Sequence, residues 1–233
     1  MEVQIGAAKV SKYATAESGD TIEMIERPHG GISAVLVDGQ RSGRSAKIIS
    51  NIVARKAISL LGEGVRDGAV ARATHDYLRT HRRGQVTAEL QIVSVDLVTR
   101  SLVISRNTHC PAYLATPEEC RALDQSSEPI GIHTSTKPVI VEVPLVPFTY
   151  VVLITDGMLL AAQRDHGGFD LATIACQRVG EGIDAQSLAD RLLEAALRAE
   201  SGRPRDDLSV MTLAVLPTDE PHRVRRLWAR FPI

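Results

Sequence analysis

Aspartates stand at the edges of strand-like segments that lie far apart in this sequence. Asp20 follows a glycine, Asp38 and Asp156 each come at the end of an apolar run and precede a glycine, and the pair Asp206-Asp207 precedes the last apolar segment. Functional side chains are often carried at the ends of elements that a rigid scaffold holds in place. We therefore expect a fold that gathers these carboxylates, spread over almost two hundred residues, at one place.

The size and charge of the chain limit its class. Its 233 residues, 44% of them hydrophobic, allow one large domain with a substantial core. The formal net charge of −1 gives no overall positive field to attract nucleic acid or an anionic membrane. The N-terminus has no basic segment followed by an apolar one, and no apolar run is long enough to span a bilayer. These features predict a cytoplasmic protein that binds neither nucleic acid nor membrane.

Three cysteines, Cys110, Cys120 and Cys176, are spread along the chain. They are odd in number and lack the short paired spacings of zinc knuckles or redox motifs. Cysteines of this kind are usually buried and behave as small hydrophobic residues. We therefore expect reduced, structural thiols.

Hydrophobic periodicity outlines the elements. Strands are predicted over residues 3–10, 32–37, 86–97, 102–104, 139–143, 150–154 and 208–216, and residues 21–26 fit a strand or a turn. Helices are predicted over residues 48–61, 67–81, 169–179 and 184–200, and residues 111–138 hold loops and strand fragments. There is no regular βαβ alternation and no internal repeat. This order favours an α+β fold in which antiparallel sheets pack together with helices outside.

The aspartates suggest a particular chemistry. Carboxylates without accompanying histidine or cysteine select hard cations such as Mg²⁺ or Mn²⁺. Two such ions, about 3.5–4 Å apart, activate a water for attack on phosphorus. The glycines after Asp38 and Asp156 allow a sharp turn and let the Gly39 carbonyl approach an ion. Each Asp-Gly pair alone also fits an ordinary turn, and Asp206-Asp207 alone fits a turn before a strand. The conjunction of all of them indicates a phosphatase with two metal ions.

Four short motifs appear in order along the chain: Ser18-Gly19-Asp20, Val37-Asp38-Gly39, Leu153-Ile154-Thr155-Asp156-Gly157 and Arg205-Asp206-Asp207-Leu208-Ser209-Val210. The chain thereby resembles the metal-dependent serine/threonine protein phosphatases of the PPM family. Within that family it resembles the SpoIIE-like bacterial branch, and most of all the free-standing RsbX type associated with stressosomes. The resemblance spans about residues 18–216. It suggests a phosphatase domain over residues 1–218 and a basic C-terminal extension over residues 219–233.

The resemblance implies a four-layer αββα sandwich, in which two antiparallel sheets are flanked by helices and a metal site lies at the sheet ends. Asp38 is expected to bridge two Mn²⁺ or Mg²⁺ ions, with the Gly39 carbonyl assisting. Asp156 and Asp206 are expected at the first ion and Asp20 at the second. The metal set implied is Asp20, Asp38, Gly39, Asp156, Asp206 and Asp207, of which Asp20, Asp38 and Asp156 are the expected catalytic residues.

The implied function is hydrolysis of phosphoserine or phosphothreonine on a bacterial stress-signalling protein. The expected partner is a phosphorylated STAS-type protein of a stressosome or an anti-anti-sigma protein, and the expected enzyme is a monomer or weak dimer. Many family members carry a histidine shortly after the second aspartate, whereas this chain reads Asp38-Gly39-Gln40-Arg41-Ser42-Gly43, so the acid for the leaving group is unassigned.

Two alternatives remain at this point. One is a catalytically silent module of the same fold that binds a phosphoprotein; the absent histidine keeps it open. The other is a dinuclear phosphodiesterase or nuclease, which the near-neutral charge and the lack of histidine ligands disfavour.

Several other residues have two interpretations. His109 fits a structural role better than a substrate contact. Arg41 and Arg44 are placed to meet phosphate, although solvated loop arginines are more common. Residues 221–231 combine four arginines with the only tryptophan. An acidic partner or nucleic acid is one interpretation, but a short final helix that packs Trp228 against the domain is the preferred one.

Overall fold

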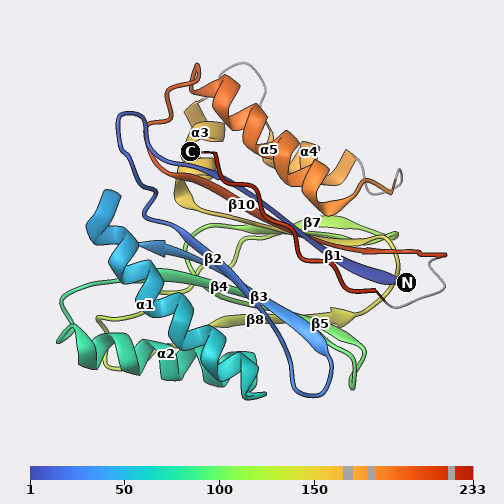
Figure 1. The fold of residues 1–233 in the computed structure, drawn as a ribbon, viewed down its shortest axis with the longest axis horizontal. Coiled ribbons are helices and arrows are strands. Elements are labelled where there is room, and N and C mark those ends of the chain that lie inside the picture. The colour runs from blue at the N-terminus through green and yellow to red at the C-terminus, as the bar shows by residue number, and fades with distance from the viewer. Residues whose placement is uncertain (165–169, 178–181, 220–223, 233) are drawn as a thin grey trace.

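The structure is a computed structural model that describes residues 1–164, 170–177, 182–219 and 224–232. Two five-stranded sheets face each other and helices cover both outer faces (Figure 1). Every pairing between neighbouring strands is antiparallel. The predicted αββα sandwich is confirmed.

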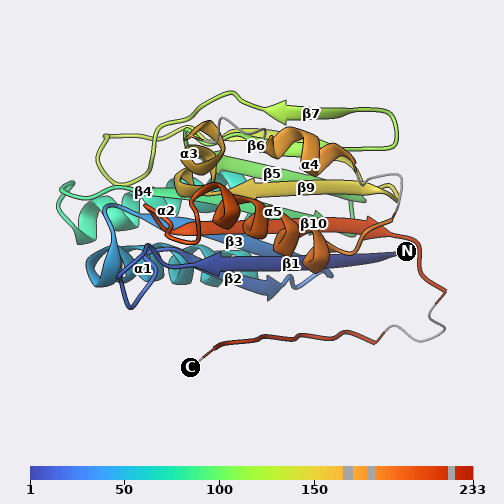
Figure 2. The same cartoon turned by 90° about the horizontal axis from the view of Figure 1, so that it is seen from above.

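The first sheet has the order β1-β10-β9-β6-β7, formed by Glu2–Val10, Leu208–Leu216, Thr149–Ile154, Ala112–Ala115 and Cys120–Leu123. The second has the order β2-β3-β4-β5-β8, formed by Thr21–Glu26, Gly31–Gly39, Ala88–Asp96, Ser101–Asn107 and Val139–Pro144. Helices α3 (Asp156–Arg164), α4 (Leu171–Gln177) and α5 (Ala185–Ala199) cover the first sheet, and α1 (Gly43–Gly62) and α2 (Asp67–His81) cover the second (Figures 1 and 2).

Three apolar layers hold the four structural layers together, one between the sheets and one under each helical layer. In β3, Ala34 and Leu36 belong to the layer between the sheets, whereas Val35 and Val37 belong to the layer under α1 and α2. This alternation follows from the two-residue period of a strand. A strand buried on both sides reads as a continuous apolar run, which is why this segment was a clear strand in the sequence.

Most predicted elements are present, one open alternative is settled, and two elements differ from their prediction. Residues 21–26 form a strand, which settles the alternative left open. Asp38 and Gly39 lie inside β3 instead of in a turn after it. Asp156-Gly157 begins helix α3, which was not predicted. The predicted helix 169–179 is represented by α4; residues 169, 178 and 179 lie outside the described ranges.

The prediction of three reduced thiols is wrong for two of them. Cys120 in β7 and Cys176 in α4 form a disulfide between residues 56 positions apart. Only Cys110 is a free, buried thiol, as expected. The two cysteines are far apart in the sequence, and only the fold brings the edge strand β7 beside α4. The pair could therefore not be predicted from cysteine spacing.

The C-terminal extension also differs from its prediction. Residues 224–232 form neither helix nor strand, and all of them are exposed. The side chain of Trp228 is 77% exposed, so it does not pack against the domain. The remaining residues of the extension, 220–223 and 233, lie outside the described ranges.

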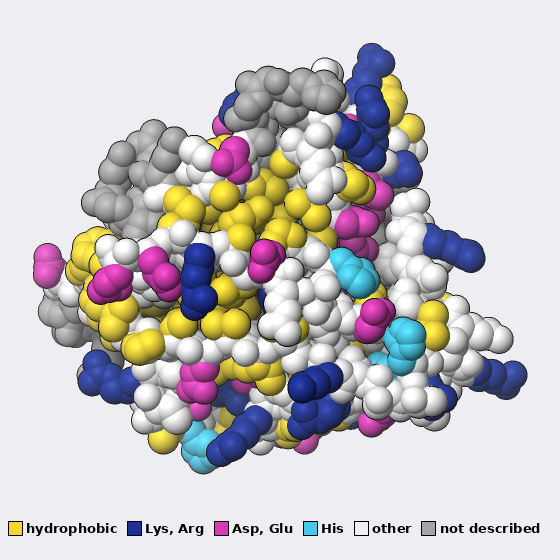
Figure 3. Space-filling model, turned by 180° about the vertical axis from the view of Figure 1, so that it is seen from behind, with side chains coloured by type: hydrophobic (Ala, Val, Ile, Leu, Met, Phe, Trp, Pro, Cys, Tyr) yellow, Lys and Arg dark blue, Asp and Glu magenta, His cyan; other side chains and the backbone are white. Residues whose placement is uncertain are grey.

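None of the helices in the described ranges has the length and apolar character needed to cross a bilayer. Seen from behind (Figure 3), hydrophobic side chains gather across the middle of the surface, and lysine and arginine side chains are scattered around it. This face therefore has no broad basic surface of the kind that binds a nucleic-acid backbone.

Candidate functional site

Carboxylates from three separate segments line one cavity of about 370 Å³. Asp38 comes from the end of β3, Asp156 from the first turn of α3, and Asp206 and Asp207 from the segment that leads into β10. Gly39 lines the same cavity. The fold thus brings together most of the predicted set at one end of the two sheets.

Glycines let the first turn of α1 approach the two N-terminal aspartate motifs. A Cβ atom on Gly39 would lie 2.1 Å from the carbonyl oxygen of Ala46, and one on Gly19 would lie 2.6 Å from the Ala46 Cβ. Neither glycine has the positive φ of a left-handed turn. Their role is therefore close packing beside Asp20 and Asp38, instead of the sharp turn that the sequence suggested.

Asp38 and Asp156 interact directly as a carboxyl–carboxylate pair. Burial, followed by the charges of Asp20, Asp156 and Glu89, raises the pKa of Asp38 to about 10. Asp38 therefore keeps its proton and donates it in a hydrogen bond to Asp156. Asp156 is open to the cavity, but loss of water, and then the charges of Asp206 and Glu89, raise its pKa as well.

Asp20 lies behind the cavity and is 1% exposed. The Ser209 hydroxyl donates a hydrogen bond of 2.6 Å to its carboxylate. Burial is the main reason that its pKa rises to about 7. The ammonium groups of Lys9 and Lys47 both donate to the Asp20 backbone carbonyl, at 2.8 and 2.6 Å. These contacts fix the backbone of Asp20 between β1 and α1.

Asp207 uses both carboxylate oxygens to hold the loop before β2. Oδ1 accepts the backbone N–H of Lys12 and Oδ2 accepts that of Gly19, each at 2.8 Å. Asp206, by contrast, accepts a hydrogen bond from the N–H of Asp207, at 3.0 Å, and from no other described residue. Asp207 is therefore engaged in positioning the Asp20 segment, and Asp206 is the freer carboxylate of the pair.

Glu89 is a further acidic residue of the cavity that the sequence motifs did not indicate. It lies opposite Asp38 in the antiparallel pairing of β3 and β4. Its carboxylate accepts hydrogen bonds from the Thr108 hydroxyl and from the His109 N–H, the latter at 3.2 Å. Glu89 thus holds the turn after β5 against the cavity wall, and its charge acts on Asp38 and Asp156. Only the strand register reveals this position.

The other residues considered in the sequence analysis do not all lie at the cavity. Gln40 and Arg41 line the cavity, whereas Arg44 and His109 are exposed and are not among its lining residues. Gln40 pairs with Thr87 through both its backbone N–H and its side-chain oxygen, each at 3.2 Å. Arg41 has a φ of 76°, which is rare for a residue with a side chain. The pairing of Gln40 with Thr87 thus fixes the backbone next to Arg41, whose side chain lies at the cavity.

The carboxylates suit hard divalent cations because all of the donors are oxygens. Among the described residues, however, no three His, Cys, Asp or Glu side chains stand as placed in a geometry that would hold an ion. The shared proton between Asp38 and Asp156 accounts for their present pairing, since two neighbouring carboxylates do not both remain charged without a cation. The oxygen donors of the cavity are of the kind that Mg²⁺ and Mn²⁺ prefer.

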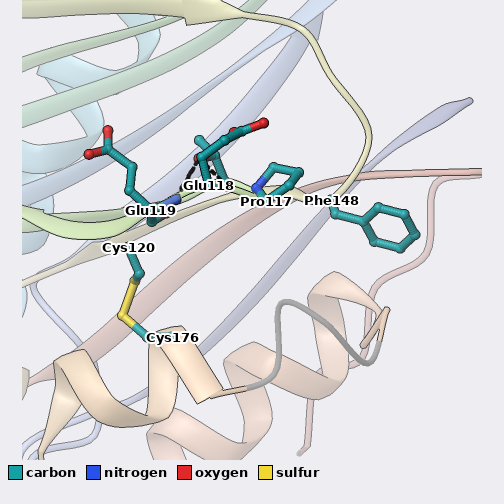
Figure 4. Close-up of a pocket in the computed structure, with 7 residues that line it drawn as sticks. Pro117, Glu118, Glu119, Cys120, Phe148 and Cys176 are labelled. Atoms are coloured by element: carbon teal, nitrogen blue, oxygen red, sulfur yellow. Dashed lines mark hydrogen bonds between the residues drawn. A yellow bond between two sulfur atoms is a disulfide. The ribbon is translucent and has the colours of Figure 1, made fainter.

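A second cavity lies beside the disulfide (Figure 4). It is lined by Thr116, Pro117, Glu118, Glu119, Cys120, Phe148 and Cys176. The carboxylates of Glu118 and Glu119 point in different directions, and the ring of Phe148 points away from both. No set of polar groups converges there among the described residues, so we place the site at the first cavity.

The raised pKa values predict that metal-free protein loses stability as pH rises from 5 to 8. In the unfolded chain an aspartate has a pKa of about 4, whereas folded Asp20 and Asp38 have pKa values of about 7 and 10. The folded state therefore binds more protons across this range. Each retained proton costs up to about 1.4 kcal/mol of stability per pH unit.

Thermal unfolding in the presence of a chelator checks this expectation. The Asp38→Asn variant serves as the control, because its amide cannot lose a proton and its melting temperature should fall less steeply with pH. A melting temperature of the unmodified protein that stays constant or rises from pH 5 to 8 would contradict the prediction.

Comparisons with known proteins show the family and the fold of the chain. The profile of the family described as stage II sporulation protein E (SpoIIE) matches residues 28–216. The chain belongs to the SpoIIE family. Stage II sporulation protein E of Bacillus subtilis (strain 168) is 22% identical over 231 residues, which are 99% of this chain and 27% of that protein. The chain therefore spans only about a quarter of that SpoIIE protein's length.

Solved structures show the same fold. The PP2C phosphatase domain of SpoIIE from Bacillus subtilis, with a fragment of its regulatory domain, has a TM-score of 0.76 and 23% identity. That alignment covers 92% of this chain and 64% of the other. RsbX in complex with magnesium has a TM-score of 0.66 and 13% identity, over 91% of this chain and 94% of the other. The resemblance to SpoIIE-like phosphatases is thus confirmed for the family and the fold, and RsbX shares the fold.

Proposed function

We propose that this chain is a metal-dependent protein serine/threonine phosphatase. The observation that carries the proposal is the convergence of Asp38, Asp156 and Asp206, from three distant segments, on one cavity of a SpoIIE-family fold. A turn or cap role would explain each aspartate separately but not their meeting. Burial and the charges of neighbouring carboxylates raise the pKa values of Asp38 and Asp156, as expected where acidic groups are held close together.

The proposed ligand set is supported by the acidic lining of the cavity. Asp38, which lies between the other acidic groups, would hold the Mn²⁺ or Mg²⁺ ions together with the Gly39 carbonyl. Asp156 and Asp206 would hold one ion, and Asp20 supports the other side from behind the cavity. Asp207 would act through the loop that it anchors. Such ions, when bound, activate water and neutralise charge on the phosphoryl group.

The chain's own residues would orient the substrate. Arg41 lines the cavity and carries a guanidinium suited to two hydrogen bonds with a phosphate dianion. Gln40 occupies the region where many family members carry a histidine, and its side-chain oxygen is already engaged with Thr87. It is therefore not placed as a proton donor to the leaving serine. A water in the open cavity would supply that proton.

We further propose a phosphorylated STAS-type protein of a bacterial stress response as the substrate, in the cytoplasm, with the enzyme a monomer or weak dimer. The support is the likeness to RsbX and SpoIIE structures. An open cavity with acidic walls and one arginine suits a phosphorylated side chain presented on a protein surface better than a nucleic acid, whose backbone the carboxylates would repel.

The test is phosphate release by metal-stripped protein while Mn²⁺ or Mg²⁺ is titrated, with p-nitrophenyl phosphate and serine- and threonine-phosphorylated peptides as substrates. Saturable, metal-dependent turnover of the monoesters supports the proposal. Binding of phosphopeptides without turnover would instead identify a silent binding module. Faster turnover of bis-nitrophenyl phosphate than of the monoester would identify a phosphodiesterase.

A further inference from the structure

The described C-terminal segment, residues 224–232, has hydrophobic side chains that no part of the structure covers. Val224, Leu227, Trp228 and Phe231 are 55%, 79%, 77% and 79% exposed. The segment lies outside the sandwich, alongside its edge (Figures 1 and 2). Arg225 of the segment forms an ion pair with Glu26 on the edge strand β2. Four large exposed apolar residues in nine are far more than a solvated tail needs.

The spacing of these residues is that of a helix, although the segment is not helical here. Val224, Leu227, Trp228 and Phe231 follow the pattern i, i+3, i+4, i+7. On a helix they would share one face about 100° wide, and Arg225, Arg226 and Arg230 would lie on the remainder. The segment therefore has the pattern of an amphipathic helix without a surface to form on. Short helices of this kind are not stable alone in water.

The charges of this segment indicate the kind of surface on which it would form a helix. Residues 221–233 contain four arginines and no aspartate or glutamate. A wholly cationic polar face, combined with tryptophan, phenylalanine and leucine on the apolar face, is typical of helices that lie in the interface of an anionic membrane. The net charge of −1 for the whole chain does not show this cationic segment, because acidic residues elsewhere in the chain offset its arginines.

The place of attachment suits such a role. Strand β10 begins beside Asp206-Asp207 and ends at Leu216, about 30 Å away along nine residues. Strand β10 thus ends at the side of the sandwich opposite to the acidic cavity, and residues 224–232 run back alongside the sandwich edge (Figures 1 and 2). Carboxylates of the cavity would be repelled by an anionic surface, whereas the extension would be attracted.

We propose that residues 224–232 fold into an amphipathic helix on an anionic lipid surface and hold the protein there peripherally. This revises the prediction, made from overall charge, that no membrane takes part. The proposal is independent of the catalytic function, since it rests only on the exposure, spacing and charge of the extension.

Trp228 makes the test direct, because it is the only tryptophan of the chain. Its fluorescence in the full, unlabelled protein is measured while vesicles of phosphatidylglycerol and phosphatidylcholine are added, with pure phosphatidylcholine vesicles in parallel. We expect a blue shift and protection from acrylamide with the anionic vesicles, cosedimentation of the protein with them, and a gain of helical signal in circular dichroism.

Two sets of variants test the arginines and the apolar side chains of the segment separately. Exchange of Arg225, Arg226 and Arg230 for glutamine should weaken vesicle binding by about 100-fold, from the attraction expected per arginine near an anionic surface. The control removes the same charge from exposed arginines of the helices, as Arg55→Gln, Arg72→Gln and Arg191→Gln, and should bind nearly as the unmodified protein does. Phe231→Ser should lose binding while thermal unfolding of the domain is unchanged.

Several results would overturn the proposal. They are a fluorescence spectrum that anionic vesicles do not change, an equal response to neutral vesicles, or an equal loss of binding in the control triple variant. Emission that is already blue-shifted and protected in the free protein would show that the segment packs on its own domain. A spectrum that responds only to an acidic protein partner would assign the segment to protein recognition instead.

Discussion

Asp38→Asn is expected to lower metal-dependent phosphatase activity by about 10³-fold or more while leaving the fold intact. The carboxylate of Asp38 lies among Asp20, Asp156 and Glu89, so in the proposed function it would be the main ligand of the metal ions. Loss of several kcal/mol of charge stabilisation corresponds to a rate decrease of this size. The measurement is kcat/KM for p-nitrophenyl phosphate at saturating Mn²⁺.

The same substitution should not destabilise the metal-free protein. At neutral pH the side chain of Asp38 is a protonated carboxyl group, and an asparagine side chain has nearly the same shape. The asparagine amide can also donate a hydrogen bond to Asp156, as the protonated carboxyl does. Its melting temperature at pH 8 in a chelator should therefore equal or exceed that of the unmodified protein. An active Asp38→Asn variant would refute the assignment of Asp38, and an unfolded one would refute the protonated state derived for it.

Gly157→Ala is expected to destabilise the domain by about 3 kcal/mol, or roughly 6–12 °C in melting temperature for a chain of this size. A Cβ atom at Gly157 would lie 2.1 Å from the carbonyl oxygen of Asp207 and 3.0 Å from its carbonyl carbon. Backbone atoms cannot rotate away as a side chain can. The start of α3 and the Asp207 segment would have to separate, and the cavity between them would widen.

Gly62→Ala is the matched control, because it also places alanine in a helix. There the new Cβ atom would make an ordinary contact of 3.4 Å with the Ile25 side chain. Alanine favours a helix over glycine by up to about 1 kcal/mol, so this variant should be as stable as the unmodified protein or more so. Equal melting temperatures for the two variants would show that the close approach at Gly157 is not required.

The sequence predicted most of the sandwich because its strands and helices carry their own signals. The run Ile32-Ser33-Ala34-Val35-Leu36-Val37 is apolar on both faces, as a strand buried between two layers must be. Leu188 and Leu192, buried on one side of α5, repeat at helical spacing. Helix α3 was missed because Asp156-Gly157, the pair that begins it, has the composition of a turn, and the described helix has only nine residues.

The site was predicted in part. Asp38, Asp156 and Asp206 were identified from motifs, and the structure brings all three to one cavity. The role of Asp207 was not visible, because its partners, the N–H groups of Lys12 and Gly19, are almost two hundred residues away. Glu89 was missed for a similar reason, since its place opposite Asp38 depends on the register between two strands.

The chain by itself thus determined the type of fold, the order of its motifs and the hard, oxygen-rich chemistry of the site. These follow from periodicity and from residue type, which are local properties. Tertiary structure alone decided that Asp38 lies beside Asp156, that Cys120 meets Cys176 and that Trp228 stays exposed. Each of these depends on the distance between segments remote in sequence, which only the packing of the sheets and helices sets.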